Sequence, residues 1–250
     1  MADRITIAVD KEGWASPILL LTWAAGTVDA IGYLGLGHVF TANMTGNAVL
    51  LGIAFGQGQF LAAFRALFAL AGFLLGVTIG AILAHRAGTD VDQRRAFVGP
   101  IIVEGLVLAL FALLLHLPMI PHNQNTLYIL IGLSAVAMGI QSAAVRRLNL
   151  PGIATTVLTG TIISLVAGLV RLLHITYVSS PTEEPAVSAP GRSRHLKLQA
   201  GVFIVYVAAA TAAGIFQHRV PLIVGLSPVV AVSLVLFFAA SSASRSKASA

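Results

Sequence analysis

The chain has 250 residues, of which 57% are hydrophobic and only 10% are charged, and its mean hydropathy is +0.91. Soluble domains are about 45 to 50% apolar and about 25% charged, so this composition excludes a soluble globular protein and indicates a polytopic membrane protein in contact with the lipid bilayer. The formal net charge is +6, but the Lys and Arg residues lie at the ends of apolar runs and form no basic face, which argues against a nucleic-acid partner.

The polar N-terminal segment, residues 1–15, mixes acidic and basic side chains and lacks the basic region of a cleaved signal peptide. We therefore expect the first apolar run, about 16–36, to be retained as a signal anchor and first transmembrane helix. This run contains Asp29. A charged side chain at the centre of a bilayer costs several kcal/mol, so such an acid usually faces a partner or a water-filled cavity.

The glycine-rich stretch GYLGLGH breaks this helix, and a shorter apolar run begins at Thr45-Gly46-Asn47 and ends near Phe55. As an α-helix, Thr45 to Gly56 would rise only about 18 Å at about 1.5 Å per residue, whereas a spanning helix needs about 20 residues. Non-helical backbone at membrane depth is tolerated only where protein buries it or water reaches it. The pattern therefore predicts a re-entrant half-helix beside a cavity.

Three runs of spanning length follow, at about 60–84, 97–117 and 127–145. The first carries Gly72, Gly76 and Gly80 at a spacing of four, a stripe that lets a neighbouring helix approach closely, either within the chain or in a second copy. The second run contains another acid, Glu104, near its start. That placement favours an interfacial position with access to water.

The second half of the chain resembles the first in its order of elements. Thr159-Gly160-Thr161 opens another short apolar run, which reaches Arg171 and would again rise about 18 Å as a helix. Residues 179–197 are rich in Pro, Ser and charged side chains and predict a flexible linker. Two more spanning helices are expected at about 198–216 and 222–239, followed by a disordered serine-rich tail, 241–250.

Superposing Thr45-Gly46 on Thr159-Gly160 aligns an upstream helix, a half-helix and two downstream helices in each half of the chain. Repeat 1 then covers about 16–117 and repeat 2 about 127–240. If both half-helices leave on the side they entered from, the fold is a single all-α transmembrane domain, 16–240. It has six transmembrane helices and two short re-entrant or broken helices, arranged as an inverted internal repeat.

The charge distribution orients this arrangement. With six spans, all of the 15 Lys and Arg residues except Arg65 and Arg219 lie on one side. If both short segments spanned the membrane instead, this bias would almost vanish. The positive-inside rule therefore favours the six-span topology, with both termini cytoplasmic.

Two paired motifs carry a resemblance to a known family. They are Ala25-Gly26-Thr27-Val28-Asp29-Ala30 with Phe40 and Met44-Thr45-Gly46-Asn47, and later Met138-Gly139-Ile140-Gln141 with Leu158-Thr159-Gly160-Thr161. The combination resembles the YoaK-like family of bacterial integral membrane proteins, over about 16–239. The resemblance implies this membrane fold and a place in the bacterial cytoplasmic (inner) membrane. It implies no activity, because that family is itself a domain of unknown function.

The half-helices suggest where a solute would bind. If they enter from opposite faces, their N-termini meet near the midplane, each with a partial positive charge of about half a unit and unpaired N–H groups that suit a polar or anionic solute. The candidate solute-binding or coupling residues are Asp29, Asn43, Thr45, Gly46, Asn47, Gln141, Thr159, Gly160 and Thr161, with His38 and Glu104 as secondary candidates. The alternative is that Asp29 caps the neighbouring half-helix in a closed structural cluster.

The sequence carries no HExxH, Walker or GxSxG motif, no haem or metal pattern and no cysteine, so we expect no enzyme, cofactor or metal. A lone mid-span acid also argues against a two-carboxylate intramembrane protease. The leading hypothesis is a small-solute transporter or channel, with Asp29 as the candidate group for proton coupling. The alternative is a non-transporting scaffold or sensor, and an enzyme acting on a lipid is a weaker third. The solute and the oligomeric state stay open.

Overall fold

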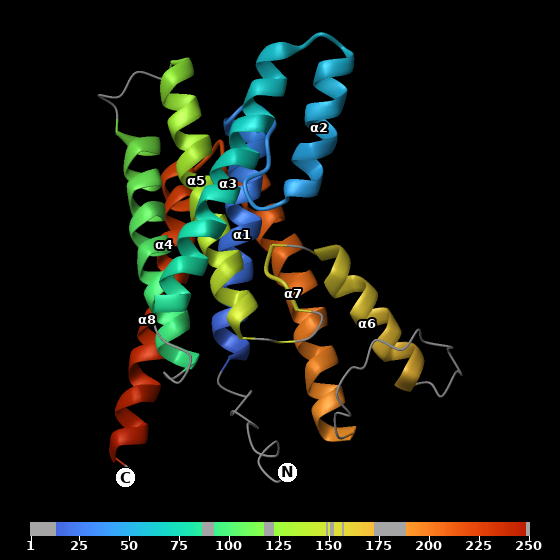
Figure 1. Cartoon of the computed structure of the whole chain (residues 1–250), viewed down its shortest axis with the longest axis vertical. Helices are drawn as coiled ribbons and strands as arrows, with labels where there is room; N and C mark the ends of the chain where they lie inside the picture. The colour runs from blue at the N-terminus through green and yellow to red at the C-terminus, as the bar shows by residue number, and fades with distance from the viewer. Residues whose placement is uncertain are drawn as a thin grey trace.

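The computed structural model describes residues 14–86, 93–117, 123–148, 150, 153–156, 158–172 and 189–248. In these ranges the secondary structure is entirely helical (Figure 1). The helices are α1 (Ala15–Gly35), α2 (Met44–Gly56), α3 (Phe60–Arg86), α4 (Gln93–His116), α5 (Gln124–Arg147), α6 (Leu158–Leu172), α7 (Ala189–Phe216) and α8 (Pro221–Ala248).

Six of these helices contain apolar segments of 21 to 26 residues, long enough to cross a membrane, whereas α2 and α6 have only 13 and 15 residues. An apolar helix satisfies its backbone hydrogen bonds internally, which is the condition for spanning the hydrocarbon region. The predicted all-α polytopic membrane fold, with six spanning helices and two short ones, is confirmed.

The two short helices run to opposite ends of the molecule. In Figure 1, α2 starts in the middle region and rises to the end where α3 begins, whereas α6 starts in the middle region and descends. The start of α1 and the end of α8 lie together at the lower end. Neither short helix therefore crosses the full height of the bundle.

α1 and α5 form the centre of the bundle. In both, 61% of the spanning segment is buried, compared with 22 to 39% in the other four long helices. α1 packs mainly against α7 and α8, and α5 packs mainly against α3 and α4. The short helices are peripheral, because α2 packs on α3 and α6 packs on α7.

The glycine stripe on α3 serves packing within the chain. A Cβ on Gly76 would overlap the carbonyl group of Val136 on α5, and one on Gly80 would lie 2.8 Å from the Cβ of Ala143. A Cβ on Gly72 would lie 3.2 Å from the carbonyl oxygen of Gly132. The stripe thus brings the α3 and α5 backbones together, which settles the choice between helix packing in one chain and packing between copies for this surface.

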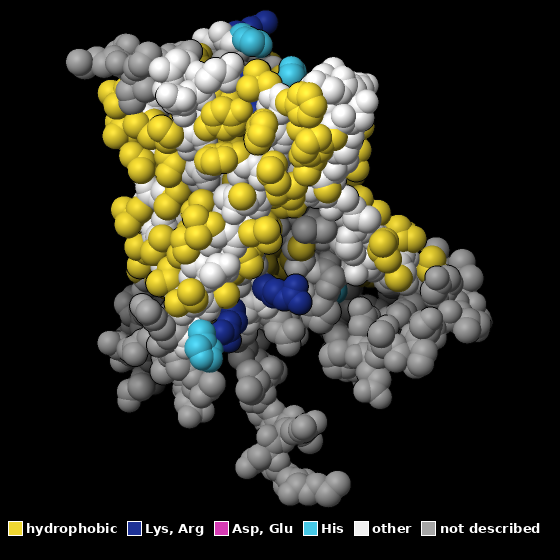
Figure 2. Space-filling model, turned by 45° about the horizontal axis from the view of Figure 1, so that its top comes forward, with side chains coloured by type: hydrophobic (Ala, Val, Ile, Leu, Met, Phe, Trp, Pro, Cys, Tyr) yellow, Lys and Arg dark blue, Asp and Glu magenta, His cyan; other side chains and the backbone are white. Residues whose placement is uncertain are grey.

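The outer surface is predominantly apolar. Figure 2 shows hydrophobic side chains over the height of the bundle, with Lys, Arg and His side chains at its two ends. Phe64, Leu74, Leu106 and Ile163 are among the large apolar side chains that face outward. This distribution is what a protein surrounded by lipid requires, because apolar surface is then in contact with acyl chains.

Two boundaries differ from the expected ones. α7 already begins at Ala189, inside the expected linker 179–197, of which 179–188 lies outside the described residues. α8 continues to Ala248, so most of the tail expected to be disordered is helical. The physical reason is that a preformed helix extends without a new nucleation cost, and Ala, Arg and Lys are good helix formers.

Candidate functional site

A buried carboxylate holds the loop that precedes α2. Asp29 lies on α1 and is 3% exposed. Its Oδ1 accepts hydrogen bonds from the backbone N–H groups of Thr41 and Ala42, both at 2.6 Å, and its Oδ2 accepts one from the N–H of Asn43 at 3.1 Å. The hydroxyl of Tyr206, on α7, donates to Oδ2 as well. Both carboxylate oxygens are therefore occupied by protein donors.

Close helix packing brings the tyrosine to this carboxylate. Gly26 lies one turn before Asp29, and a Cβ at this position would be 2.7 Å from the carbonyl oxygen of Tyr206. Only a glycine allows α7 to approach α1 this closely. The Tyr206 hydroxyl thereby reaches Oδ2 of the acid, the oxygen that also accepts the Asn43 N–H.

The chain reverses direction between α1 and α2 through two left-handed residues, Gly37 with φ 83° and His38 with φ 61°. This reversal returns residues 39–43 along α1 to the level of Asp29. His38 is exposed, and its ring packs edge-on against Tyr33 with centroids 5.1 Å apart. It contributes to the turn, and the hydrogen bonds to the Asp29 carboxylate come from the loop and from Tyr206 instead.

Two asparagines fix the start of α2. The side chain of Asn43 caps the helix by accepting the Gly46 N–H at 3.1 Å. Asn47, which is fully buried, accepts the Phe40 N–H at 2.9 Å and donates to the Phe40 carbonyl at 2.5 Å. The first turn of α2 is thus tied to its own entry loop.

The loop before α6 is held in a related way by neutral groups. Gln141, fully buried on α5, donates from Nε2 to the Thr155 hydroxyl at 2.8 Å and to the Leu21 carbonyl at 3.1 Å. The hydroxyls of Ser142 and Thr156 are also 2.8 Å apart. In both halves a central helix therefore holds the entry loop of a short helix.

The hydrogen bond between Asn47 and the Phe40 N–H, at the start of α2, has a counterpart at the start of α6. Thr161 accepts the backbone N–H of Ala154 at 3.3 Å, across the same seven-residue separation as the bond from Phe40 to Asn47. Thr161 is buried, as Asn47 is. Both short helices therefore begin with a side chain that reaches back seven residues.

The other predicted site residues lie apart from these contacts. Thr45, Thr159 and Gly160 are exposed on the first turns of α2 and α6, and Gly46 packs under the Phe40 ring. Within the described residues α2 and α6 do not pack against each other. The structure therefore brings together Asp29, Asn43 and Asn47 in one cluster and Gln141 and Thr161 in another, and the two helix starts do not meet.

Glu104 lies where the sequence did not place it. An interfacial, hydrated position was expected, but Glu104 is 0% exposed, and neither of its carboxylate oxygens has a hydrogen-bond partner. The spanning segment begins at Ala96, close to the expected start, but Glu104 is the ninth of its 21 residues and lies on the buried face of α4 with Ile101 and Leu108. The acid therefore lies in the middle of a spanning helix.

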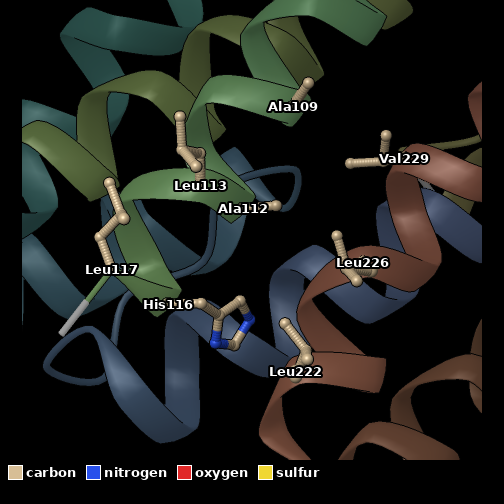
Figure 3. Close-up of a pocket in the computed structure, with 8 residues that line it drawn as sticks. All are labelled: Ala109, Ala112, Leu113, His116, Leu117, Leu222, Leu226 and Val229. Carbon is tan, nitrogen blue, oxygen red and sulfur yellow. The ribbon is translucent and has the colours of Figure 1, made fainter.

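A pocket of about 280 Å³ lies between α4 and α8, away from both loop clusters. Its walls are apolar except for His116, whose ring points into the gap between the two helices (Figure 3). The Nε2 atom of His116 is buried without a hydrogen-bond partner, and the ring packs against Gly225, where a Cβ would overlap it. Among the described residues, no group of three His, Asp or Glu side chains is placed to hold a metal ion.

Several residues of these sites were not predicted. Tyr206 and His116 stand in or at the end of apolar runs, where sequence gives no indication of a partner. Thr155 and Thr156 could have been found from the alignment of the two Thr-Gly motifs, because they precede Thr159-Gly160 as Thr41-Ala42 precedes Thr45-Gly46.

Six apolar helices of spanning length, two short helices and the buried polar clusters at their entry loops define a polytopic α-helical membrane protein. Residues 18–244 match the model of a family described as protein of unknown function (DUF1275), and the chain belongs to this family. It is 44% identical over 147 residues to the UPF0700 transmembrane protein YoaK of Bacillus subtilis (strain 168). The alignment covers 58% of this chain and 63% of that relative, so less than two thirds of the relative's length is spanned. No solved structure matches the chain.

Proposed function

We propose that the protein is a small-solute transporter or channel of the bacterial cytoplasmic membrane, built as an inverted repeat around α2 and α6. The observation that carries this proposal is the pair of short helices that begin at mid-depth and run to opposite ends, each with its entry loop held by a central helix. Broken helices of this kind, related by inversion, are typical of secondary transporters.

Three further correspondences support the repeat. α1 packs on α7 and α8 as α5 packs on α3 and α4. Gly26 on α1 faces the Tyr206 carbonyl of α7, and Gly139 on α5 faces the Phe73 carbonyl of α3. Pro100 and Pro228 are each the eighth residue of their helix, counted from Gln93 and Pro221. Each of these three features of the first half thus has a counterpart in the second.

In this proposal a polar solute contacts the exposed first turn of α2, where Thr45 lies, or that of α6, where Thr159 and Gly160 lie, and each start is a separate contact point. Helix N-termini favour negative charge, so a polar or anionic solute suits both. Asp29 has a positioning role, because its acceptors are filled by the loop and by Tyr206. The charge bias along the chain supports cytoplasmic termini.

The test uses the absence of cysteine, which makes every single-cysteine variant specific. Thr45→Cys and Thr159→Cys, in proteoliposomes, should react with a membrane-impermeant maleimide if water reaches the helix starts. Leu74→Cys and Leu106→Cys are the controls, because these exposed apolar positions lie well inside the spanning segments of α3 and α4, where they face lipid and should stay unlabelled. If Thr45→Cys and Thr159→Cys are as unreactive as the controls, the aqueous site does not exist.

Transport itself is then measured as protein-dependent swelling of the proteoliposomes in urea, glycerol, formate and nitrate. We expect at least one of these solutes to enter faster than in empty liposomes. A Thr45→Val variant should reduce that rate while keeping the parent melting temperature, because its side chain is exposed.

The saturated carboxylate favours a second candidate, a non-transporting membrane scaffold whose polar clusters only fix helix packing. Asp29 accepts three backbone N–H groups and a hydroxyl, which is a complete structural cap. For a scaffold, Asp29→Asn would lower thermal stability, and no solute would enter proteoliposomes of the parent protein. Labelling of Thr45→Cys therefore separates the two candidates.

A further inference from the structure

The second buried acid differs from Asp29 in having no donors. Glu104 occurs in the buried stripe of α4 between Ile101 and Leu108, one turn away on either side, and all three are 0% exposed. Both flanking residues belong to the main apolar core. Neither carboxylate oxygen has a hydrogen-bond partner.

Such a carboxyl cannot be a simple ion. Burying an unpaired carboxylate costs several kcal/mol even after relaxation, and such groups take up a proton instead. Among the described residues, no further Asp, Glu or His side chains gather around Glu104 to form a metal site with it. The group that satisfies Glu104 is therefore a proton.

The described parts of the helices that pack against α4 carry no charged side chain in their middle. α4 packs against α3, α5 and α8, and α8 has no titratable side chain between Pro221 and Ser241. The titratable residues of the other two helices all lie within two turns of a helix end: Arg65, His85 and Arg86 on α3, and Tyr128, Arg146 and Arg147 on α5. No neighbouring charge on these helices stabilises an ionised Glu104, so its charge depends only on whether the carboxyl carries a proton.

The proposed repeat indicates that packing does not require an acid here. Glu104 and Val232 each lie four residues after the proline of their helix, Pro100 or Pro228. Val232 is also 0% exposed. A hydrocarbon side chain fills the corresponding position in the second half of the chain. Packing therefore does not explain the carboxyl group in the first half, and we expect it to have a chemical role.

One ridge of α4 connects this acid to the pocket between α4 and α8. Glu104, Leu108, Ala112 and His116 follow one another at steps of four, and Ala112 and His116 line the pocket (Figure 3). The distance from Glu104 to Ala112 along the helix is about 12 Å at about 1.5 Å per residue. His116 offers a ring nitrogen without a partner at the mouth of this route.

We propose that Glu104 is a proton-exchange site, and that its proton enters and leaves along the α4 ridge through the pocket that bears His116. In each exchange the carboxyl O–H bond breaks, the proton passes to a water molecule that enters from the pocket, and the carboxylate regains a proton from water by the same route. His116 takes up and releases this proton at the pocket, because it lies about 18 Å from Glu104 along the helix, too far for direct transfer. If the protein is a transporter, Glu104 and not Asp29 supplies the coupling proton. The exchange itself needs no solute, so it is tested independently of transport.

The experiment is infrared spectroscopy of the full chain in liposomes in potassium buffer. Subtracting the spectrum of Glu104→Gln from that of the parent should leave the carbonyl stretch of a protonated carboxyl at neutral pH. This band should shift in deuterated water and disappear at alkaline pH, and Glu104→Asp should keep a titrating band at another frequency. If Glu104→Gln fails to fold, Glu104→Val replaces it as the reference, because valine is the residue at the corresponding position, Val232, of the second half.

The route is tested by the rate of the deuterium shift. His116→Gln should slow it severalfold, because the pocket then lacks the imidazole that takes up and releases protons. His38→Gln, at an exposed histidine, should leave the rate unchanged. An absent band, a band that neither exchanges nor titrates, or a band that sodium removes overturns the site. An unchanged rate in His116→Gln overturns the route.

Discussion

Replacing Asp29 by asparagine tests how the loop before α2 is held. Asparagine keeps one carbonyl oxygen, which can still accept the N–H groups of Thr41 and Ala42. The new NH₂ group takes the place of Oδ2, where it faces the Asn43 N–H, and this donor loses its partner. Hydrogen bonds to a charged group contribute about 1.5 to 3 kcal/mol each, and a stranded buried donor costs about 1 to 3 kcal/mol.

The expected loss is therefore about 3 kcal/mol for Asp29→Asn. In a chain of this size about 1 kcal/mol corresponds to roughly 2 to 4 °C, so the melting temperature should fall by roughly 6 to 12 °C. Asp29→Ala strands all the donors and should cost more. Tyr206→Phe removes only the hydroxyl bond and should cost less.

The assay is intrinsic fluorescence during thermal unfolding in detergent. Both tryptophans, Trp14 and Trp23, are at or in α1, the helix that carries Asp29, so they report on the right element. Thr45→Ala serves as the control, because this exposed side chain should leave the melting temperature unchanged. An Asp29→Asn protein that melts with the parent would refute the capping argument.

Three further outcomes are expected. Asn47→Leu removes both bonds to the Phe40 backbone and should lower stability by about 1 to 3 kcal/mol in the same melting assay; a neutral effect would contradict the description of the α2 entry loop. Gly76→Ala should lose about 1 to 3 kcal/mol through overlap with α5, whereas Gly52→Ala, with open space around it, should be neutral or gain up to about 1 kcal/mol. Gly58→Cys and His218→Cys should both be labelled from outside intact cells by an impermeant maleimide, because the six-span topology puts both turns on one face; opposite faces would exclude it.

Much of the fold follows from the length of the apolar runs. The six long runs and the two short ones are visible in the sequence, because a spanning helix needs a minimum number of apolar residues and the half-helices fall below it. Helix ends were less certain, since polar residues such as Gln93 and Ser241 continue a helix once it has formed.

The cap on α2 was also partly visible. A lone acid such as Asp29 in an apolar run needs donors, and the adjacent glycine-rich break indicated where they would come from. The hydroxyl of Tyr206 could not be predicted, because it lies 177 residues along the chain from Asp29 and no local pattern distinguishes it from an interfacial tyrosine. Glu104 was misplaced because its burial depends on which face of α4 packs against the other helices, and the sequence of α4 alone does not determine that face.

The separation between Asp29 and Tyr206 has a consequence for biosynthesis. When α1 and α2 leave the ribosome, the carboxylate can already bind the amides of Thr41 and Ala42, but its last donor belongs to a helix that has not yet been made. Until α7 is synthesised, the first half of the nascent protein therefore contains a buried carboxylate that lacks one of its hydrogen-bond donors. The insertion of α7 supplies this last donor and packs α7 against α1. The polar contacts of the N-terminal half are therefore completed only when a C-terminal helix is in place.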